Sequence, residues 1–143
     1  MHMMGRLFGL KGSMVQERSN QLLSEVGLDS AADRRIGSYS RGMMQRIGLA
    51  QALINDPDLV ILDEPTSGLD PLARMEIRRI ITRLRDHGKT VFFSSHELSE
   101  VERVCDHLAI LNRGLVAVQG RSDELLSDHT NLEQYFLNTV EAG

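Results

Sequence analysis

The chain has 143 residues, of which 41% are hydrophobic and 25% charged, the balance of a folded domain that can bury a core. Its net charge of −4, its lack of a Lys/Arg-rich block and its aromatic content of 4% argue against nucleic acid as a partner. No apolar run approaches the roughly 18 residues of a membrane span, and the N-terminus does not read as a signal peptide. One cysteine, Cys105, cannot form an internal disulfide, so we expect a cytoplasmic protein.

The first part of the chain is predicted to be helical. The pattern QERSNQLLSEV indicates an amphipathic helix from Gln16 to Val26, closed by Gly27 and followed by an irregular polar stretch. Ser40 is a suitable N-cap for a second helix, which we expect from about Gly42 to Ile54. The sequence NDPD then ends this helix.

Strands and helices are predicted to alternate in the rest of the chain. We expect Leu59–Leu62 to be a strand buried on both faces, as in a parallel sheet, and Val91–Ser94 to be a second strand. Pro71 is suited to the first position of a helix between them, which ends at His87-Gly88. The remaining expected elements are a helix over 97–105, a hairpin over 108–118 around the turn NRG, and helices over 123–127 and 132–140. This alternation predicts an α/β core.

The run LVILDEPTSGLD, Leu59 to Asp70, joins an apolar strand to two adjacent carboxylates. Acids at a strand end commonly face solvent or cap the next helix. In the functional interpretation, Asp63 holds Mg²⁺ through water, while Glu64 orients or deprotonates the water that attacks a γ-phosphate. A bound metal keeps one carboxylate ionised and leaves its neighbour free to act as a base.

His96 follows the second predicted strand, in FFSSHE. A lone histidine is more often structural than catalytic, but ligands of open α/β sheets bind at the carboxyl ends of strands. Two adjacent parallel strands would bring Glu64 and His96 to the same edge. The imidazole could there donate a hydrogen bond to the γ-phosphate.

The stretch YSRGMMQRIGLAQAL, Tyr39 to Leu53, could bind an anion at the start of its helix. The Ser40 hydroxyl, the Gly42 backbone and the helix N-terminus would all offer positive dipole. On spacing alone, a well-capped surface helix is the simpler interpretation.

Together these stretches resemble three motifs of the ATP-binding cassette (ABC) ATPases. YSRGMMQR resembles the signature motif, usually Leu-Ser-Gly-Gly-Gln, any residue, then Gln-Arg. LVILDEPTSGLD resembles the Walker B strand, catalytic glutamate and D-loop, and FFSSHE resembles the switch-histidine strand. The resemblance covers nearly the whole chain. It implies part of a P-loop NTPase (RecA-like) α/β core with parallel strands, in residues 57–143, and part of the ABC helical subdomain, in residues 1–56.

The resemblance also implies residue roles, with ATP and Mg²⁺ as cofactors. Asp63 becomes the Mg²⁺-associated acid, Glu64 the general base and His96 the γ-phosphate switch. The residues implied to contact nucleotide belong to the signature and the D-loop: Ser40, Arg41, Gly42, Met43, Gln45 and Asp70. Two ATP molecules would be sandwiched head to tail in a dimer, so that the signature serves the ATP held by the opposite subunit.

Three signature positions depart from the family's usual form. Tyr39, Arg41 and Met43 stand where Leu, Gly and Gln are usual, as in bacterial multidrug or ABC-2-type exporter ATPases. The family's phosphate loop, GxxxxGK[ST], has no counterpart in this sequence. GLKGS lacks the required order, and HGKT precedes a predicted strand with Arg83 where the first glycine should be.

We therefore expect a carboxyl-terminal part of a nucleotide-binding domain, with the phosphate loop upstream and weak or absent ATP binding by the chain alone. In the family the phosphate-loop strand lies beside the His96 strand, so that strand should here have an unpaired edge.

The resemblance implies an ATPase subunit that powers substrate movement through a separate membrane permease. It would dimerise with a second nucleotide-binding domain and lie at the inner face of the cell membrane. Two alternatives stay open: a soluble non-transport ABC ATPase, and a truncated, non-catalytic partner that regulates by dimerising. Co-purification with a membrane protein or with ribosomes would separate the transport and non-transport classes. A natively short chain would favour the regulatory one.

Overall fold

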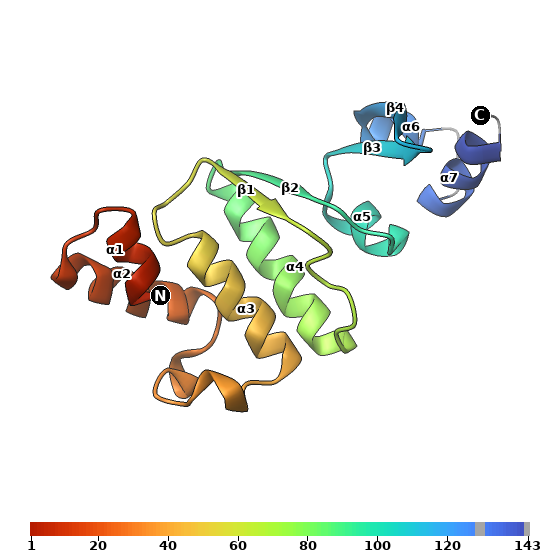
Figure 1. Cartoon of the computed structure of the whole chain (residues 1–143). Helices are drawn as coiled ribbons and strands as arrows, with labels where there is room; N and C mark the ends of the chain where they lie inside the picture. Colours follow the sequence, from red (N-terminus) through yellow and green to blue (C-terminus); the bar gives the residue numbers. More distant parts are fainter. Residues whose placement is uncertain (128–130, 142–143) are drawn as a thin grey trace. The chain divides into compact units, whose positions relative to one another are not determined.

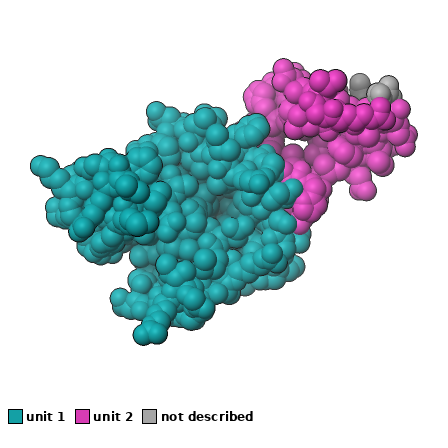
Figure 2. Space-filling view, viewed as in Figure 1, with its two compact units in different colours: residues 1–94 teal, residues 95–143 magenta. Residues whose placement is uncertain are grey.

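The computed structural model describes residues 1–127 and 131–141, which fall into two compact units: residues 1–94, and the described residues from 95 onward (Figures 1 and 2). The first unit contains, in chain order, α1 (His2–Leu7), α2 (Gly12–Glu25), the 3-10 helices η1 (Asp29–Ala31) and η2 (Ile36–Ser38), α3 (Arg41–Ala52), β1 (Leu59–Leu62), α4 (Pro71–Asp86) and β2 (Thr90–Phe93). The second contains α5 (Leu98–Val104), β3 (His107–Asn112), β4 (Leu115–Arg121), α6 (Ser122–Leu125) and α7 (Leu132–Glu141). The division into family subdomains at residues 56 and 57 stays a prediction.

β1 and β2 form the parallel pair that the sequence predicts, with α4 as the helix that connects them. The register places Leu59 opposite Thr90 and Leu62 opposite Phe93. This sheet has two strands within the described residues, so β2 has an edge without a strand partner, as expected. Parallel strands joined by a helix confirm the α/β fold class.

The prediction that β1 is buried on both faces is wrong for this structure. Val60 is only 3% exposed, but its neighbours Leu59 and Ile61 are 52% and 69% exposed. Phe92, which pairs with Ile61 on β2, is 62% exposed. Successive side chains of a strand point to opposite faces, and in the described residues only the face that carries Val60 is covered. We call Leu59, Ile61 and Phe92 the open face of the sheet.

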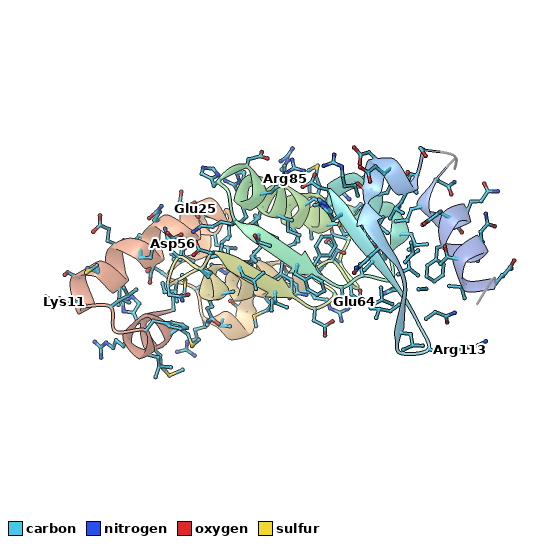
Figure 3. All side chains as sticks on the ribbon, turned by 90° about the horizontal axis from the view of Figure 1, so that it is seen from above. Lys11, Glu25, Asp56, Glu64, Arg85 and Arg113 are labelled. Carbon is cyan, nitrogen blue, oxygen red and sulfur yellow. The ribbon has the colours of Figure 1, made fainter. Side chains whose placement is uncertain are left out.

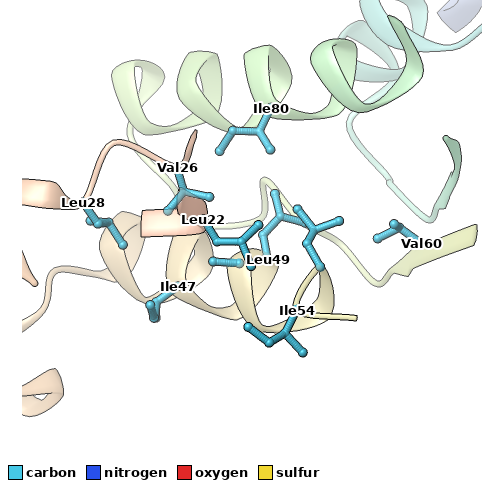
Figure 4. Close-up of a cluster of buried hydrophobic side chains, with 10 residues drawn as sticks. Leu22, Val26, Leu28, Ile47, Leu49, Ile54, Val60 and Ile80 are labelled. Atoms are coloured by element: carbon cyan, nitrogen blue, oxygen red, sulfur yellow. The ribbon is translucent and has the colours of Figure 1, made fainter. Parts of the chain in front are cut away.

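The core of the first unit brings together α2, α3, α4 and β1 (Figure 4). Leu22 of α2 is fully buried, and it shares this cluster with Val60 of β1 and Ile80 of α4. The residues that α3 buries in the cluster are Ile47, Leu49 and Ala50, followed by Leu53 and Ile54 just beyond the helix. Their helical spacing explains why the sequence pattern locates this helix correctly.

Two arginines fix the carboxyl end of α2, where main-chain carbonyls lack partners within the helix. Arg46 of α3 donates from Nη1 to the carbonyl oxygens of Val26, at 3.0 Å, and Gly27, at 3.2 Å. Arg83 of α4 donates to the carbonyl oxygen of Glu25. These bonds attach α2 to both neighbouring helices. The helix begins at Gly12, about one turn before its predicted start, and α1 was not predicted at all.

The second unit is built around the predicted hairpin of β3 and β4. Arg113 and Gly114, at the turn, have φ angles of 50° and 81°. Positive φ at both central residues suits the turn that joins two twisted antiparallel strands. Within the described parts of the chain, no helix is long and apolar enough to cross a membrane.

Candidate functional site

Asp63, predicted to hold Mg²⁺, and Glu64, predicted to be the general base, follow the carboxyl end of β1, where Ser94 contacts both. The Oγ of Ser94 donates to Oδ1 of Asp63 over 2.6 Å and accepts a hydrogen bond from the backbone N–H of Glu64 over 3.0 Å. The Ser94 N–H also donates to the carbonyl oxygen of Leu62, at 3.0 Å. One serine thus holds the Asp63 carboxylate and the Glu64 backbone in fixed positions, at the sheet edge where α/β proteins bind ligands.

Glu64, labelled in Figure 3, follows the end of β1. Its backbone φ is 47°, in the left-handed region that residues other than glycine rarely adopt. Holding a glutamate there costs on the order of 1–3 kcal/mol, and such strain concentrates at functional sites. The Glu64 N–H donates to Ser94, and the Glu64 carbonyl accepts the N–H of Ser67, at 3.1 Å. The acid therefore sits on a loop held from both sides.

Replacing Ser94 with alanine is expected to lower the free energy of unfolding by about 1–2 kcal/mol, because a hydrogen bond to a charged group and one to a strained loop are lost together. Urea denaturation measures this change. Ser24→Ala is the matched control, since Ser24 is exposed on α2, and it should change stability by less than about 0.5 kcal/mol. Equal effects of the two substitutions would contradict the role given to Ser94.

Asp70 is the N-cap of α4. Its Oδ1 accepts the N–H groups of Leu72 and Ala73, both at 3.0 Å, and Pro71 occupies the first helical position as predicted. Arg74 donates from Nε to the carbonyl oxygen of Leu69, at 2.9 Å. The structure thus gives Asp70 a structural role within its own chain, and its nucleotide contact stays a prediction.

The start of α3 carries the signature-like residues. Ser40 is the N-cap, as predicted, with Oγ accepting the N–H of Met43 at 3.3 Å. Gly42 is buried against α4, where a Cβ on it would lie 2.8 Å from the Cβ of Ala73. Gly42 thus approaches a helix of its own chain closely. Met43 packs against the core, Gln45 lies half-buried on α3, and their predicted nucleotide contacts stay predictions.

Arg41 lies beside the turn that precedes α4. Its Nη1 donates to the carbonyl oxygen of Gly68 over 3.3 Å. Its predicted contact with nucleotide stays a prediction.

The Gly-Lys-Thr sequence within HGKT, which lacks the pattern of a phosphate loop, lies at the opposite end of the sheet, and its lysine forms ion pairs there. The Nζ of Lys89 pairs with Oδ1 of Asp56 at 3.0 Å and with Oδ1 of Asp58 at 3.7 Å. Gly88 lies between the end of α4 and β2, so the sequence precedes a strand. Figure 3 shows Asp56 and Glu64 at opposite ends of β1. This confirms that HGKT is not a phosphate loop.

His96 is exposed in the second unit, just before α5. The prediction that His96 and Glu64 lie at the same edge of the sheet stays a prediction. In the same unit, burial and the neighbouring Asp106 raise the pKa of the Cys105 thiol to about 11, so it is protonated at neutral pH and unsuited to nucleophilic attack. The described ranges contain no group of three or more His, Cys, Asp or Glu side chains placed to hold a metal ion.

Comparison with known proteins agrees with this geometry. Residues 7–67 match the family described as ABC transporter. An ABC transporter ATP-binding protein of Nostoc sp. is 52% identical over 122 residues, which are 84% of this chain and 36% of that protein. The chain belongs to the ABC ATPase family. A solved ATP-binding subunit of an ABC transporter matches this ABC chain with a TM-score of 0.78 at 28% identity, over 96% of this chain and 61% of that one.

Other relatives carry more specific names. The Nod factor export ATP-binding protein I of Cupriavidus metallidurans is 43% identical, over 85% of this chain and 40% of its own length. The ABC transporter ATP-binding protein NatA of Bacillus subtilis is 37% identical, over 97% of this chain and 57% of its own length. The ABC chain therefore spans between about a third and three fifths of these relatives.

Sequence reasoning missed Ser94, although the signal was present. In the parallel register Leu62 pairs with Phe93, so the next residue of each strand, Asp63 and Ser94, must be neighbours. Ser94 follows β2 by one residue, and Asp63 follows β1 by one residue. Once the two strands are assumed to pair in parallel, the Ser94 hydroxyl is therefore expected beside the Asp63 carboxylate. The contact between Arg41 and Gly68 had no such signal, because it joins α3 to a turn distant in sequence.

Proposed function

We propose that this ABC chain provides the acid-bearing and signature parts of an ATP-hydrolysing subunit, which powers substrate movement through a separate membrane permease. The observation that supports this most is the arrangement of Asp63 and Glu64 around Ser94 at the ends of two parallel strands. The names of the relatives, which include an export protein, favour transport. By this proposal the subunit lies at the cytoplasmic face of the membrane.

Each side chain has a defined task in this proposal. The 2.6 Å bond from Ser94 Oγ holds the Asp63 carboxylate in place, where its oxygens would bind a hydrated magnesium ion. When bound, Mg²⁺ neutralises charge on the ATP phosphates. Glu64 accepts a proton from the attacking water as the water oxygen bonds to the γ-phosphorus and the bond from that phosphorus to the β–γ bridging oxygen breaks, so that ADP and phosphate leave. Its backbone, fixed in the left-handed region, keeps the carboxylate near one position and lowers the cost of orienting it.

In this proposal the amino end of α3 contributes to the ATP site of the opposite subunit. Its free N–H groups and the Ser40 hydroxyl present positive dipole, and α3 is 12 residues long. In a head-to-tail dimer this end faces the γ-phosphate held by the opposite subunit. Ser40 thus serves one ATP molecule while Glu64 of the same chain serves the other.

The described residues fit only part of a nucleotide site. They supply the acids and the signature, but neither lysine of the chain stands in the order GxxxxGK[ST]: Lys11 precedes Gly12 instead of following a glycine, and Lys89 is paired with Asp56 and Asp58. Backbone amides and a lysine are what hold the β- and γ-phosphates in P-loop proteins. The 143-residue chain alone is therefore expected to bind ATP weakly or not at all.

Calorimetric titration of the 143-residue chain with Mg-ATP tests this expectation, and a micromolar dissociation constant would refute it. Joining the phosphate-loop half of the Nostoc relative ahead of Met1 tests the function itself. The fusion should bind and hydrolyse ATP. A folded fusion that binds ATP without hydrolysing it would overturn the proposed catalytic role. Co-purification of the subunit with a membrane protein tests the permease partner.

A further inference from the structure

The turn between the acids and α4 is held from two helices. Residues 67–70, the D-loop segment, receive Arg41 of α3 at the carbonyl of Gly68 and Arg74 of α4 at the carbonyl of Leu69. The side chain of Leu69 is 5% exposed and forms part of the core. Two guanidinium groups thus bind successive carbonyls of one short turn, which restricts its backbone on both sides.

The contact of Arg41 is close as well as polar. Gly68 has a φ of 66°, and a Cβ on it would lie 2.5 Å from Nη1 and 2.9 Å from Cζ of Arg41. The guanidinium group therefore packs directly over the α-carbon of Gly68. Glycine at this position satisfies both requirements, the left-handed backbone and the space for the arginine.

The same region joins the start of α3 to the catalytic glutamate. Gly42, next to Arg41, packs against Ala73 of α4. On the other side of the turn, Ser67 donates to the carbonyl of Glu64, at 3.1 Å. A continuous set of contacts thus leads from the first turn of α3, through Gly68 and Ser67, to Glu64.

We propose that Arg41 is a positioning residue, which fixes the D-loop segment to the amino end of α3 so that the two move as one body. The consequence of this inference for catalysis rests on the proposed function, in which Ser40 and Glu64 serve different ATP molecules. Arg41 then connects the two ATP sites of a dimer through contacts within one chain. It does so through the Gly68 carbonyl, without touching the reacting atoms.

Amide hydrogen exchange of the 143-residue chain tests the positioning directly, without ATP. In Arg41→Met, the amides of Ser67 and Leu69 should exchange about tenfold faster, since one hydrogen bond and a close contact are lost. The amides in the middle of α2 should be unchanged. Arg41→Lys keeps the charge and should restore part of the protection. Arg35→Met is the matched control, because Arg35 is an exposed arginine in the same unit.

Unchanged exchange at Ser67 and Leu69 in Arg41→Met would overturn the inference, as would equal acceleration in Arg35→Met. The ATP-hydrolysing fusion gives the second readout. There Arg41→Met should lower kcat severalfold with little change in KM for ATP, and Arg41→Lys should recover part of kcat. If the fusion hydrolyses no ATP but exchange responds as expected, the proposed function fails and the positioning role stands.

Discussion

Replacing Glu64 with glutamine is expected to reduce ATP turnover of the complete nucleotide-binding subunit by about 10²–10⁴-fold, the usual contribution of a general base. Glutamine has the same shape and keeps the hydrogen bond that the backbone N–H of residue 64 donates to Ser94, so the loop and ATP binding should be retained. The amide cannot accept the proton of the attacking water at neutral pH. Steady-state hydrolysis and nucleotide titration, each on the fusion protein, measure the two effects separately.

Glu17→Gln provides the control for this experiment, because Glu17 is exposed on α2 in the same unit and should leave turnover unchanged. The assignment of the base fails if Glu64→Gln keeps turnover within about threefold of the parent. A loss of ATP binding together with turnover would instead give Glu64 a role in holding the nucleotide, and it would contradict the mechanism above.

Gly42→Ala is expected to destabilise the first unit by about 1–3 kcal/mol, although alanine normally favours a helix. The added methyl group would lie 2.8 Å from the Cβ of Ala73, so α3 and α4 would have to separate. Gly48→Ala is the matched control in the same helix, because nothing lies within 4 Å of a Cβ there. It should stabilise by about 0.5–1 kcal/mol. Urea denaturation of both variants measures this contrast in sign.

A double substitution separates packing from local effects on α3. Gly42→Ala combined with Ala73→Gly moves the methyl group from one helix to the other and removes the clash. The free energy of unfolding of the double variant should therefore exceed, by about 1 kcal/mol or more, the value expected from adding the changes of the two single variants. This is the usual size of the coupling between contacting residues. Additive effects would show that the cost of Gly42→Ala comes from the start of the helix and not from α4.

The secondary structure was largely predictable because its signals are local. Ser40 and Asp70 cap their helices through bonds to residues two or three positions away, and Pro71 fits the first turn of α4 whatever the rest of the chain does. The parallel pairing of β1 and β2 follows from alternation along the chain. The family assignment came from the same source, since its motifs are short and contiguous.

The tertiary contacts of the site were not predictable in the same way. The sequence predicts that the Gly42 backbone offers positive dipole to an anion, but it does not predict the close neighbour observed, Ala73, which only the crossing of α3 and α4 reveals. The exposure of Ile61 was also missed, because an apolar run reads the same whether one face or both are covered. The contact of Ser94 with Asp63 is intermediate in predictability, since the register of the two strands is enough to place these residues side by side.

The open face of Leu59, Ile61 and Phe92 has a thermodynamic consequence for the first unit. Each square ångström of apolar surface removed from water contributes about 25 cal/mol, and the unfolded chain has no such ordered face to offer. A molecule that covers this face therefore binds the folded unit and not the unfolded chain, and it raises the melting temperature by mass action. When the free concentration of that molecule exceeds its dissociation constant, the stabilisation grows with the logarithm of that concentration. The heat stability of this unit is consequently a property of the solution around it as well as of its own sequence.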